Sequence, residues 1–284
     1  MQTSSERDRV IALGDGRALS AGADGLLKLW ELRTGKSLRT LRGHTGEVRA
    51  VAATAEGAAS IAADGLRRWR ADGSEAGPAL DLGVDPIALC AHGARAWVMA
   101  RDGALLAVDL GTMTVSRLTA AAITGALCLA VDPAGKRALV GSADTTLRLI
   151  DLERGAELRA LRGHSWDVQA VAFHPDGRRA LSTSRDKSVK LWDLASGRCL
   201  ATFARHAGSG AVLASWPDGA LLASCPDDKT LELWREDDRV VARWPAEAAL
   251  TAIALEPGGR MVIGDVAGQV TWLELVTWTG TNPV

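Results

Sequence analysis

Tryptophan recurs along this chain at nearly constant spacing, each time within a similar short group of residues. Trp192 lies in the segment 189–194, VKLWDL, and tryptophan takes the same place at 30, 69 and 234. The series continues through apolar residues at 108, 150 and 273, so the steps are 39, 39, 42, 42, 42 and 39 residues. A fixed period near 40 residues over the whole chain indicates a repeat architecture.

Each repeat consists of short apolar runs that are separated by turn-forming residues. The fifth repeat has apolar runs at 168–173 and 189–194, with Pro175-Asp176-Gly177 after the first of them. Runs this short, rich in Val, Leu and Ala, are typical of strands rather than helices. Proline, aspartate and glycine each favour a tight turn for a separate reason. We therefore expect about four short antiparallel strands in each repeat.

The best-formed repeats also share a histidine, a turn aspartate and the tryptophan at fixed separations, and in the fifth repeat a glycine precedes the histidine. His164 precedes Asp186 by 22 residues, and Asp186 precedes Trp192 by six. The same separations occur at His206, Asp228 and Trp234. These repeats resemble WD40 repeats, and the resemblance extends over essentially all 284 residues in seven units. It implies an all-β, seven-bladed β-propeller of four-stranded antiparallel blades, because stacking sheets around an axis buries their faces.

The repeat period predicts a single WD40-type domain over residues 1–284. The expected blades are roughly 1–41, 42–80, 81–119, 120–161, 162–203, 204–244 and 245–284. The last blade is expected to be incomplete, because Gly280 and Pro283 interrupt the residues after its third strand and residues 1–7 offer little for a fourth. We expect it to have three strands, or to be completed weakly by one terminus or by a neighbouring chain.

Serine, histidine and aspartate within one repeat could suggest a hydrolase triad. The combination recurs in several repeats, however, and no Gly-x-Ser-x-Gly turn surrounds these serines. The resemblance instead implies a buried hydrogen-bond network, in which Asp orients His, His bonds the serine hydroxyl, and that hydroxyl bonds the tryptophan N–H. The expected members are His44, Ser60, Asp64 and Trp69; His164, Ser182, Asp186 and Trp192; His206, Ser224, Asp228 and Trp234; and, without a histidine, Ser20, Asp24 and Trp30.

Composition argues against several other functions. The net charge is −1, from 33 basic and 34 acidic residues without a basic cluster, so nucleic-acid binding has little electrostatic support. The N-terminal segment is polar, which argues against a signal peptide, and no apolar stretch is long enough to cross a bilayer. The four cysteines lack metal-site spacing. We therefore expect a cytoplasmic protein, bacterial in composition, with no cofactor, metal site or catalytic residue.

Two functions remain open at this point. The resemblance implies a non-catalytic interaction scaffold or sensor propeller, either monomeric or part of a larger bacterial signalling assembly, with protein partners rather than nucleic acid or membrane. The alternative is a propeller enzyme of the hydrolase or lactonase type, with its site at the central channel. The acidic candidates for such a site, Asp85, Asp167 and Asp227, come from different repeats and have no histidine beside them. His174 precedes Pro175 and is expected in a solvated turn.

In the WD40 family the narrower top face commonly docks partners. This face carries the loops that lead into each innermost strand and the turns that hold the network aspartate. Tryptophan and arginine are enriched at binding hot spots. Trp166 is the strongest candidate, because it is a large aromatic residue in an otherwise polar loop. The full set of candidate partner-binding residues is Trp166, Arg185, Arg49, Arg101, Gln169, Asp167, Asp227 and Glu47.

Overall fold

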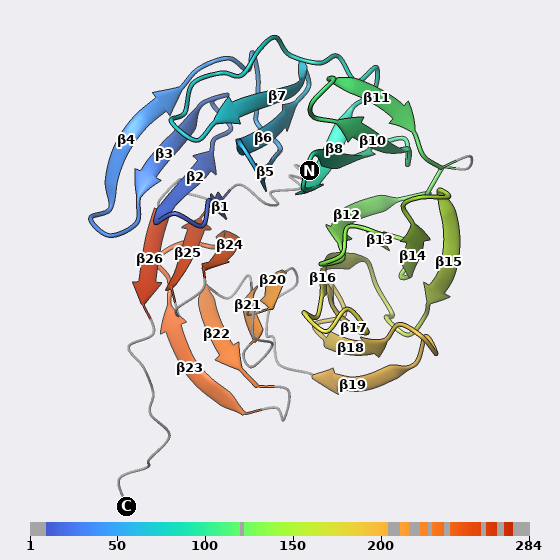
Figure 1. Cartoon of the computed structure of the whole chain (residues 1–284). Helices are drawn as coiled ribbons and strands as arrows, with labels where there is room; N and C mark the ends of the chain where they lie inside the picture. Colours follow the sequence, from blue (N-terminus) through green and yellow to red (C-terminus); the bar gives the residue numbers. More distant parts are fainter. Residues whose placement is uncertain are drawn as a thin grey trace, which may run out of the picture.

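The chain forms antiparallel β-sheets arranged in a ring (Figure 1). The computed structural model describes residues 10–119, 122–203, 211–215, 222–226, 229–235, 239–256, 260–265 and 270–274. All of the named elements in these ranges are β-strands. Within each sheet, strands that follow one another along the chain pair as antiparallel neighbours. The prediction of an all-β propeller is confirmed.

Five of the described sheets have four strands each. They consist of β1 (Val10–Ala12), β2 (Arg17–Ala21), β3 (Leu27–Glu31) and β4 (Lys36–Leu41); β8 (Pro86–His92), β9 (Arg95–Ala100), β10 (Leu105–Asp109) and β11 (Thr114–Arg117); β12 (Ala126–Val131), β13 (Arg137–Ser142), β14 (Leu147–Asp151) and β15 (Ala156–Leu161); β16 (Val168–Phe173), β17 (Arg179–Ser184), β18 (Val189–Asp193) and β19 (Cys199–Phe203); and β20 (Ala211–Ser215), β21 (Leu222–Pro226), β22 (Thr230–Trp234) and β23 (Val240–Pro245). The first strand of each lies nearest the middle of the ring (Figure 1).

The sheet of the second repeat has three strands, so the expectation of seven four-stranded blades is wrong there. It consists of β5 (Ala50–Thr54), β6 (Gly57–Ala62) and β7 (Gly65–Arg70). The segment in the place of a fourth strand meets β7 only through isolated bridges, Leu66 with Leu80 and Trp69 with Glu75. Pro78 within this segment has no N–H to continue a ladder. Gly77 beside it has a φ of 128°, which departs from strand geometry.

The described part of the last sheet also has three strands, β24 (Leu250–Glu256), β25 (Arg260–Asp265) and β26 (Val270–Glu274). Residues 1–9 and 275–284 lie outside the described residues, so the prediction of how this blade is completed stays a prediction. The ring closes where β1 packs against β24 and β25. Val10, Ala252 and Val262 are buried in one apolar cluster at this junction.

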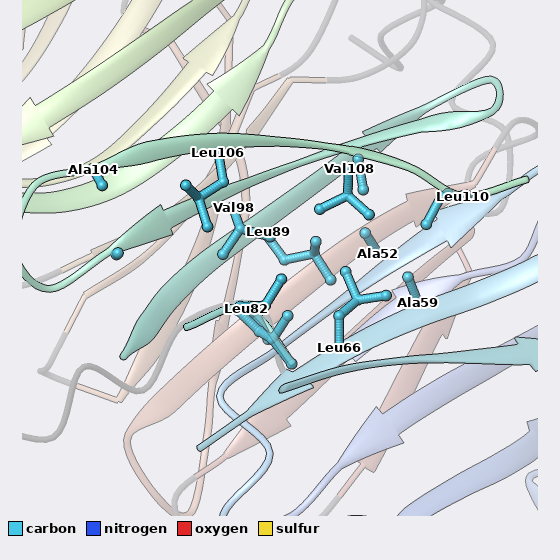
Figure 2. Packing of buried hydrophobic residues seen from close by; sticks show 14 residues of the cluster. Ala52, Ala59, Leu66, Leu82, Leu89, Val98, Ala104, Leu106, Val108 and Leu110 are labelled. Carbon is cyan, nitrogen blue, oxygen red and sulfur yellow. The ribbon is translucent and has the colours of Figure 1, made fainter. Parts of the chain in front are cut away.

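Neighbouring sheets pack face to face through apolar side chains. Between the second and third repeats, Leu66 from β7 and Leu89 from β8 are buried in the same cluster as Leu106 from β10 (Figure 2). Alternation along each strand directs one set of side chains to each neighbouring sheet. The core is therefore a series of apolar layers between sheets, and it leaves the loops on the two flat faces available for function.

The repeated tryptophans lie on the third strand of their sheets. Trp192 on β18 is fully buried, and its partner across the ladder is Ala180 on β17. Alanine also lies opposite Trp30 and Trp69. A small residue opposite these three indoles leaves room for the ring within the layer between sheets; opposite Trp234 the ladder has Leu222.

The turn after β16 is more closely packed than the sequence suggests. The Asp176 carboxylate accepts hydrogen bonds from the backbone N–H groups of Arg178 and Arg179, at 2.7 and 3.0 Å. His174 is only 6% exposed, with Nδ1 3.0 Å from the Asp176 carboxylate. The expectation of a solvated histidine is therefore wrong, because the turn folds back over the imidazole.

Candidate functional site

In the fifth repeat, the four residues of the predicted network lie within hydrogen-bond distance of one another. His164 follows β15, Ser182 lies on β17 and Trp192 on β18. The imidazole Nδ1 is 2.8 Å from the Asp186 carboxylate, and Nε2 is 2.7 Å from the Ser182 hydroxyl. That hydroxyl accepts a 2.8 Å hydrogen bond from the Trp192 indole N–H. Each buried polar side chain of this network thereby has a hydrogen-bond partner.

The second repeat has the same arrangement. His44 Nδ1 lies 2.5 Å from the Asp64 carboxylate, and its Nε2 lies 2.7 Å from the Ser60 hydroxyl. The Trp69 indole N–H donates to Ser60 at 2.8 Å. In both repeats the aspartate also accepts the backbone N–H of the residue after the histidine, Thr45 or Ser165. The network therefore fixes the loop that leads into the innermost strand.

The first and sixth repeats contain parts of the network. Trp30 donates to the Ser20 hydroxyl at 2.8 Å, while the exposed Asp24 accepts the Leu26 backbone N–H at 3.0 Å. In the sixth repeat, Trp234 is fully buried and its ring centroid lies 4.9 Å from that of Phe203. The remaining predicted members are not described. His206 and Asp228 lie outside the described residues, and for Ser224 only the backbone is described.

The third repeat replaces three members of the network together. Strand register places Val98 and Val108 where the fifth repeat has Ser182 and Trp192, and Leu82 takes the place of the histidine. All three are buried in one apolar cluster (Figure 2). Exchanging every partner for apolar groups leaves no donor stranded, and such an exchange costs little. Sequence comparison could have found this joint replacement, since all three positions change at once.

The buried geometry argues against catalysis by these serines. The Ser182 side chain is fully buried, and both the imidazole and the indole bond its hydroxyl. A substrate therefore has no path to this oxygen, whereas a triad nucleophile must reach a scissile carbonyl. The arrangement supports the position of a loop and a strand rather than a reaction.

Burial lowers the pKa of the His44 and His164 imidazoles, although the paired carboxylates oppose this effect. Burial by itself raises the pKa of Asp186, but hydrogen bonds from Ser188, the Ser165 N–H and His164 outweigh it and lower that pKa to about 2. The folded protein therefore favours neutral histidine beside ionised aspartate.

These pKa shifts predict that acid destabilises the protein in two stages. The unfolded chain binds more protons than the folded one below the ordinary histidine pKa of 6.5, so stability should fall as the pH drops from 7 to 5. A further loss should follow as the pH drops from 3.8 towards 2, where Asp186 becomes protonated. Urea unfolding midpoints would measure both stages. A double variant, His44→Asn and His164→Asn, should show a flatter dependence between pH 7 and 5; an unchanged slope would contradict the assignment.

On the top face, two of the candidate arginines are held by one aspartate. Arg49, before β5, pairs with the Asp85 carboxylate and donates to the Pro86 carbonyl at 2.8 Å. Arg101, after β9, donates to the other Asp85 oxygen at 2.7 Å. Burial by itself raises the pKa of Asp85. The two arginines lower it by more, so the pKa lies below its ordinary value. This ionic cluster joins the second and third repeats, and sequence spacing within one repeat does not reveal it.

Trp166 lies in the loop that leads into β16, and the residue is 57% exposed. Arg185 lies in the turn after β17, where its backbone N–H donates to the Asp167 carbonyl at 3.0 Å. Its guanidinium lies 3.7 Å from the Asp167 carboxylate. The structure thus brings Trp166, Asp167 and Arg185 together at the top of one sheet.

The other top-face candidates are more scattered. Glu47 is exposed in the loop before β5, and Gln169 is half-buried on β16. Asp227 lies outside the described residues.

A cavity of about 410 Å³ is the part of the described structure most relevant to the enzyme alternative. The innermost strands β8, β12 and β16 line it, mainly with apolar side chains. Asp132 at its edge is 3% exposed, and its carboxylate is bound by the backbone N–H of Lys136 and by Arg137. Within the described residues, no group of three or more His, Cys, Asp or Glu side chains is placed to hold a metal ion.

Comparison with known families identifies three repeats. The WD40 family, described as WD domain, G-beta repeat, matches residues 116–151, 155–193 and 197–235. The second and third segments begin at or just before an outermost strand, β15 or β19, and end after the third strand of the next sheet, β18 or β22. A search of curated proteins found no match. Over the part of the chain that the structure describes, no helix has the length and apolar character needed to cross a membrane.

Proposed function

This chain belongs to the WD40-repeat β-propeller family, and from that premise we propose that it is a non-catalytic interaction module whose top face binds protein partners. The proposal takes all seven described sheets as blades of one ring. Propellers of this kind expose two flat faces of loops on a rigid support, and loops on a rigid scaffold commonly carry binding function.

The exposed Trp166 is the observation that carries the proposal. Trp192 and Trp234 are fully buried in the layers between sheets, whereas Trp166 presents more than half of its side chain to solvent. Single exposed apolar residues are common on protein surfaces, but Trp166, at 57%, is the most exposed large apolar residue in the described part of the chain. Tryptophan also dominates the binding energy of many interfaces when a partner buries it.

We also propose that the partners are proteins rather than nucleic acids, and that the chain acts in the cytoplasm as a monomer or as part of a larger signalling assembly. The near-neutral charge supports the first point, since it provides little attraction for phosphate backbones. The buried Ser182 and the fully bonded Asp132 speak against the hydrolase alternative.

The substitution Trp166→Ala tests the proposal. We expect it to weaken capture of native partners from the source organism by about 30-fold or more, the effect of a typical hot-spot residue. Immobilised wild type and variant would be compared by quantitative mass spectrometry of the bound proteins. The melting temperature should not change, because the exposed indole does not support the core.

The matched control is Leu200→Ala. Leu200 is 53% exposed on the outermost strand β19 of the same sheet, at the rim of the ring. This variant should bind like wild type. If the two variants bind alike at unchanged thermal stability, the interface lies elsewhere on the propeller.

A further inference from the structure

We infer that the top face of the fifth repeat binds an acidic segment of a partner protein, with carboxylates of that segment on Arg185 and Lys187 and an apolar side chain against Trp166. This inference rests on the proposed function and names the chemistry of its partner. Three features of the site carry it: an arginine without a hydrogen-bonded carboxylate, a turn with its aspartate buried and its basic side chains exposed, and an ordered loop that carries an exposed tryptophan.

The first feature is that Arg185 is held more loosely than its counterpart in the third repeat. Arg101 donates to Asp85 at 2.7 Å, whereas the Arg185 guanidinium lies 3.7 Å from Asp167, beyond hydrogen-bond distance. The Arg185 side chain is 48% exposed. Its guanidinium carries five N–H donors, and a planar fork of this kind can bind a carboxylate through two of them.

The preceding sheet explains part of the difference between the pairing of Arg101 and that of Arg185. In the third repeat, Arg49 from the preceding sheet also pairs with the aspartate. Strand register places Leu127 at the corresponding position of the sheet that precedes the fifth repeat. Leucine offers no charge to Asp167, so the ionic cluster between sheets is not repeated here. The fifth repeat is left with a less constrained arginine beside an exposed tryptophan.

The second feature is the turn between β17 and β18, in which the carboxylate of Asp186 is buried while Arg185 and Lys187 are exposed. The Asp186 carboxylate is only 10% exposed and is bound by His164, the Ser165 N–H and Ser188. Lys187 follows it and is exposed; its φ is 67°, and its N–H donates to the Ser184 carbonyl at 3.1 Å. Arg185 and Lys187 therefore present positive charge to solvent from either side of an inward-facing acid, and this complements an acidic ligand.

The third feature is that the loop of Trp166 is fixed before any partner arrives. The Trp166 carbonyl accepts the Ser184 hydroxyl at 2.9 Å, and the adjacent Ser165 N–H donates to Asp186 at 3.0 Å. A preorganised loop loses little conformational entropy on binding. The backbone that carries the indole is thus ordered before binding, and it is bonded to Ser184 and Asp186, the chain neighbours of Arg185 and Lys187.

Selection from a displayed library of random heptapeptides tests the inference. The library would be panned on the wild-type protein after depletion on the Trp166→Ala variant, so that peptides bound elsewhere are removed. We expect the enriched peptides to combine two or more Asp or Glu residues with one aromatic or large aliphatic residue. Library members with mainly Lys and Arg should be depleted, because they are repelled by Arg185 and Lys187.

Affinities of the enriched peptides, made synthetically, give the second measurement. In fluorescence anisotropy, Trp166→Ala should weaken binding by about 30-fold or more and Arg185→Glu by about tenfold. Binding should also weaken between 0.15 and 1 M salt, as the screening length falls from about 8 to 3 Å. The matched control is Arg178→Glu, which reverses an exposed arginine in the turn at the opposite end of the same sheet and should leave affinity unchanged.

The outcomes separate this inference from the proposed function. Enriched peptides that need Trp166 but are neutral or basic would overturn the acidic partner and keep the binding face. Failure to enrich any Trp166-dependent peptide would also overturn the inference, while the effect of Trp166→Ala on native capture would still decide the proposed function. The protein could instead bind a labelled single-stranded oligonucleotide through Trp166 and in preference to all peptides. That result would overturn the protein partner in favour of a nucleic acid.

Discussion

Trp192→Ala is expected to lower the free energy of unfolding by about 3–5 kcal/mol, the usual cost of truncating a buried large aromatic residue. The side chain is fully buried between sheets and lies in one cluster with Leu149 and Phe173. Its loss leaves a cavity there and removes the indole N–H that donates to the Ser182 hydroxyl, which then contacts only His164. Chemical denaturation monitored by circular dichroism would measure the change.

The substitution Trp192→Phe separates the two contributions. It keeps most of the buried ring but removes the N–H that donates to Ser182, so the loss should be about 1–3 kcal/mol. Trp30→Phe is the matched control, because Trp30 is only half-buried and its serine contacts no described histidine. The control should lose less. Equal losses at the two positions, or an unchanged stability of Trp192→Phe, would mean that the network does not stabilise the fold as its geometry indicates.

The second large effect is expected for Asp186→Ala. The carboxylate accepts hydrogen bonds from the Ser165 N–H, the Ser188 N–H and hydroxyl, and faces His164 Nδ1. Removing it strands two or more buried donors at about 1–3 kcal/mol each, so the total loss should be about 2–5 kcal/mol. Thermal unfolding would show the loss, and hydrogen exchange should show faster opening at the loop that carries Trp166.

Asp24→Ala provides the comparison for this variant. Asp24 occupies the corresponding turn of the first repeat, but it is exposed and accepts the Leu26 N–H within its own turn. Its removal should cost less than about 1 kcal/mol, as is usual for exposed sites. A loss as large as that of Asp186→Ala would show that the turn aspartate acts locally, without the contribution of a buried histidine.

Much of the architecture follows from features that are local in the chain. The spacing of Trp30, Trp69, Trp192 and Trp234 predicts their place on the third strand of each sheet, because each repeat is one supersecondary unit of similar length. Turn residues such as Pro175-Asp176-Gly177 separate the strands by their own backbone preferences. The all-β ring could be predicted for these reasons.

Other features could not be predicted, because they depend on contacts across sheets. The second repeat loses its outer strand because the residues around Pro78 pair with β7 only at isolated antiparallel bridges, although the period of 39 residues suggests a complete blade. Similarly, the position of His174 before Pro175 predicts a solvated turn residue, yet the folded turn buries its imidazole.

The features of the candidate site also separate into those that follow from the sequence and those that only the structure shows. The sequence by itself determined which repeats hold a complete set of Ser, His, Asp and Trp, since these residues recur at constant separations within one unit. Only the tertiary structure decided that Arg49 and Arg101 share Asp85 while Arg185 stays loosely held beside the exposed Trp166. The physical reason is that the charges at the top face meet between neighbouring sheets, and their distances are set by the packing of the ring rather than by spacing along the chain.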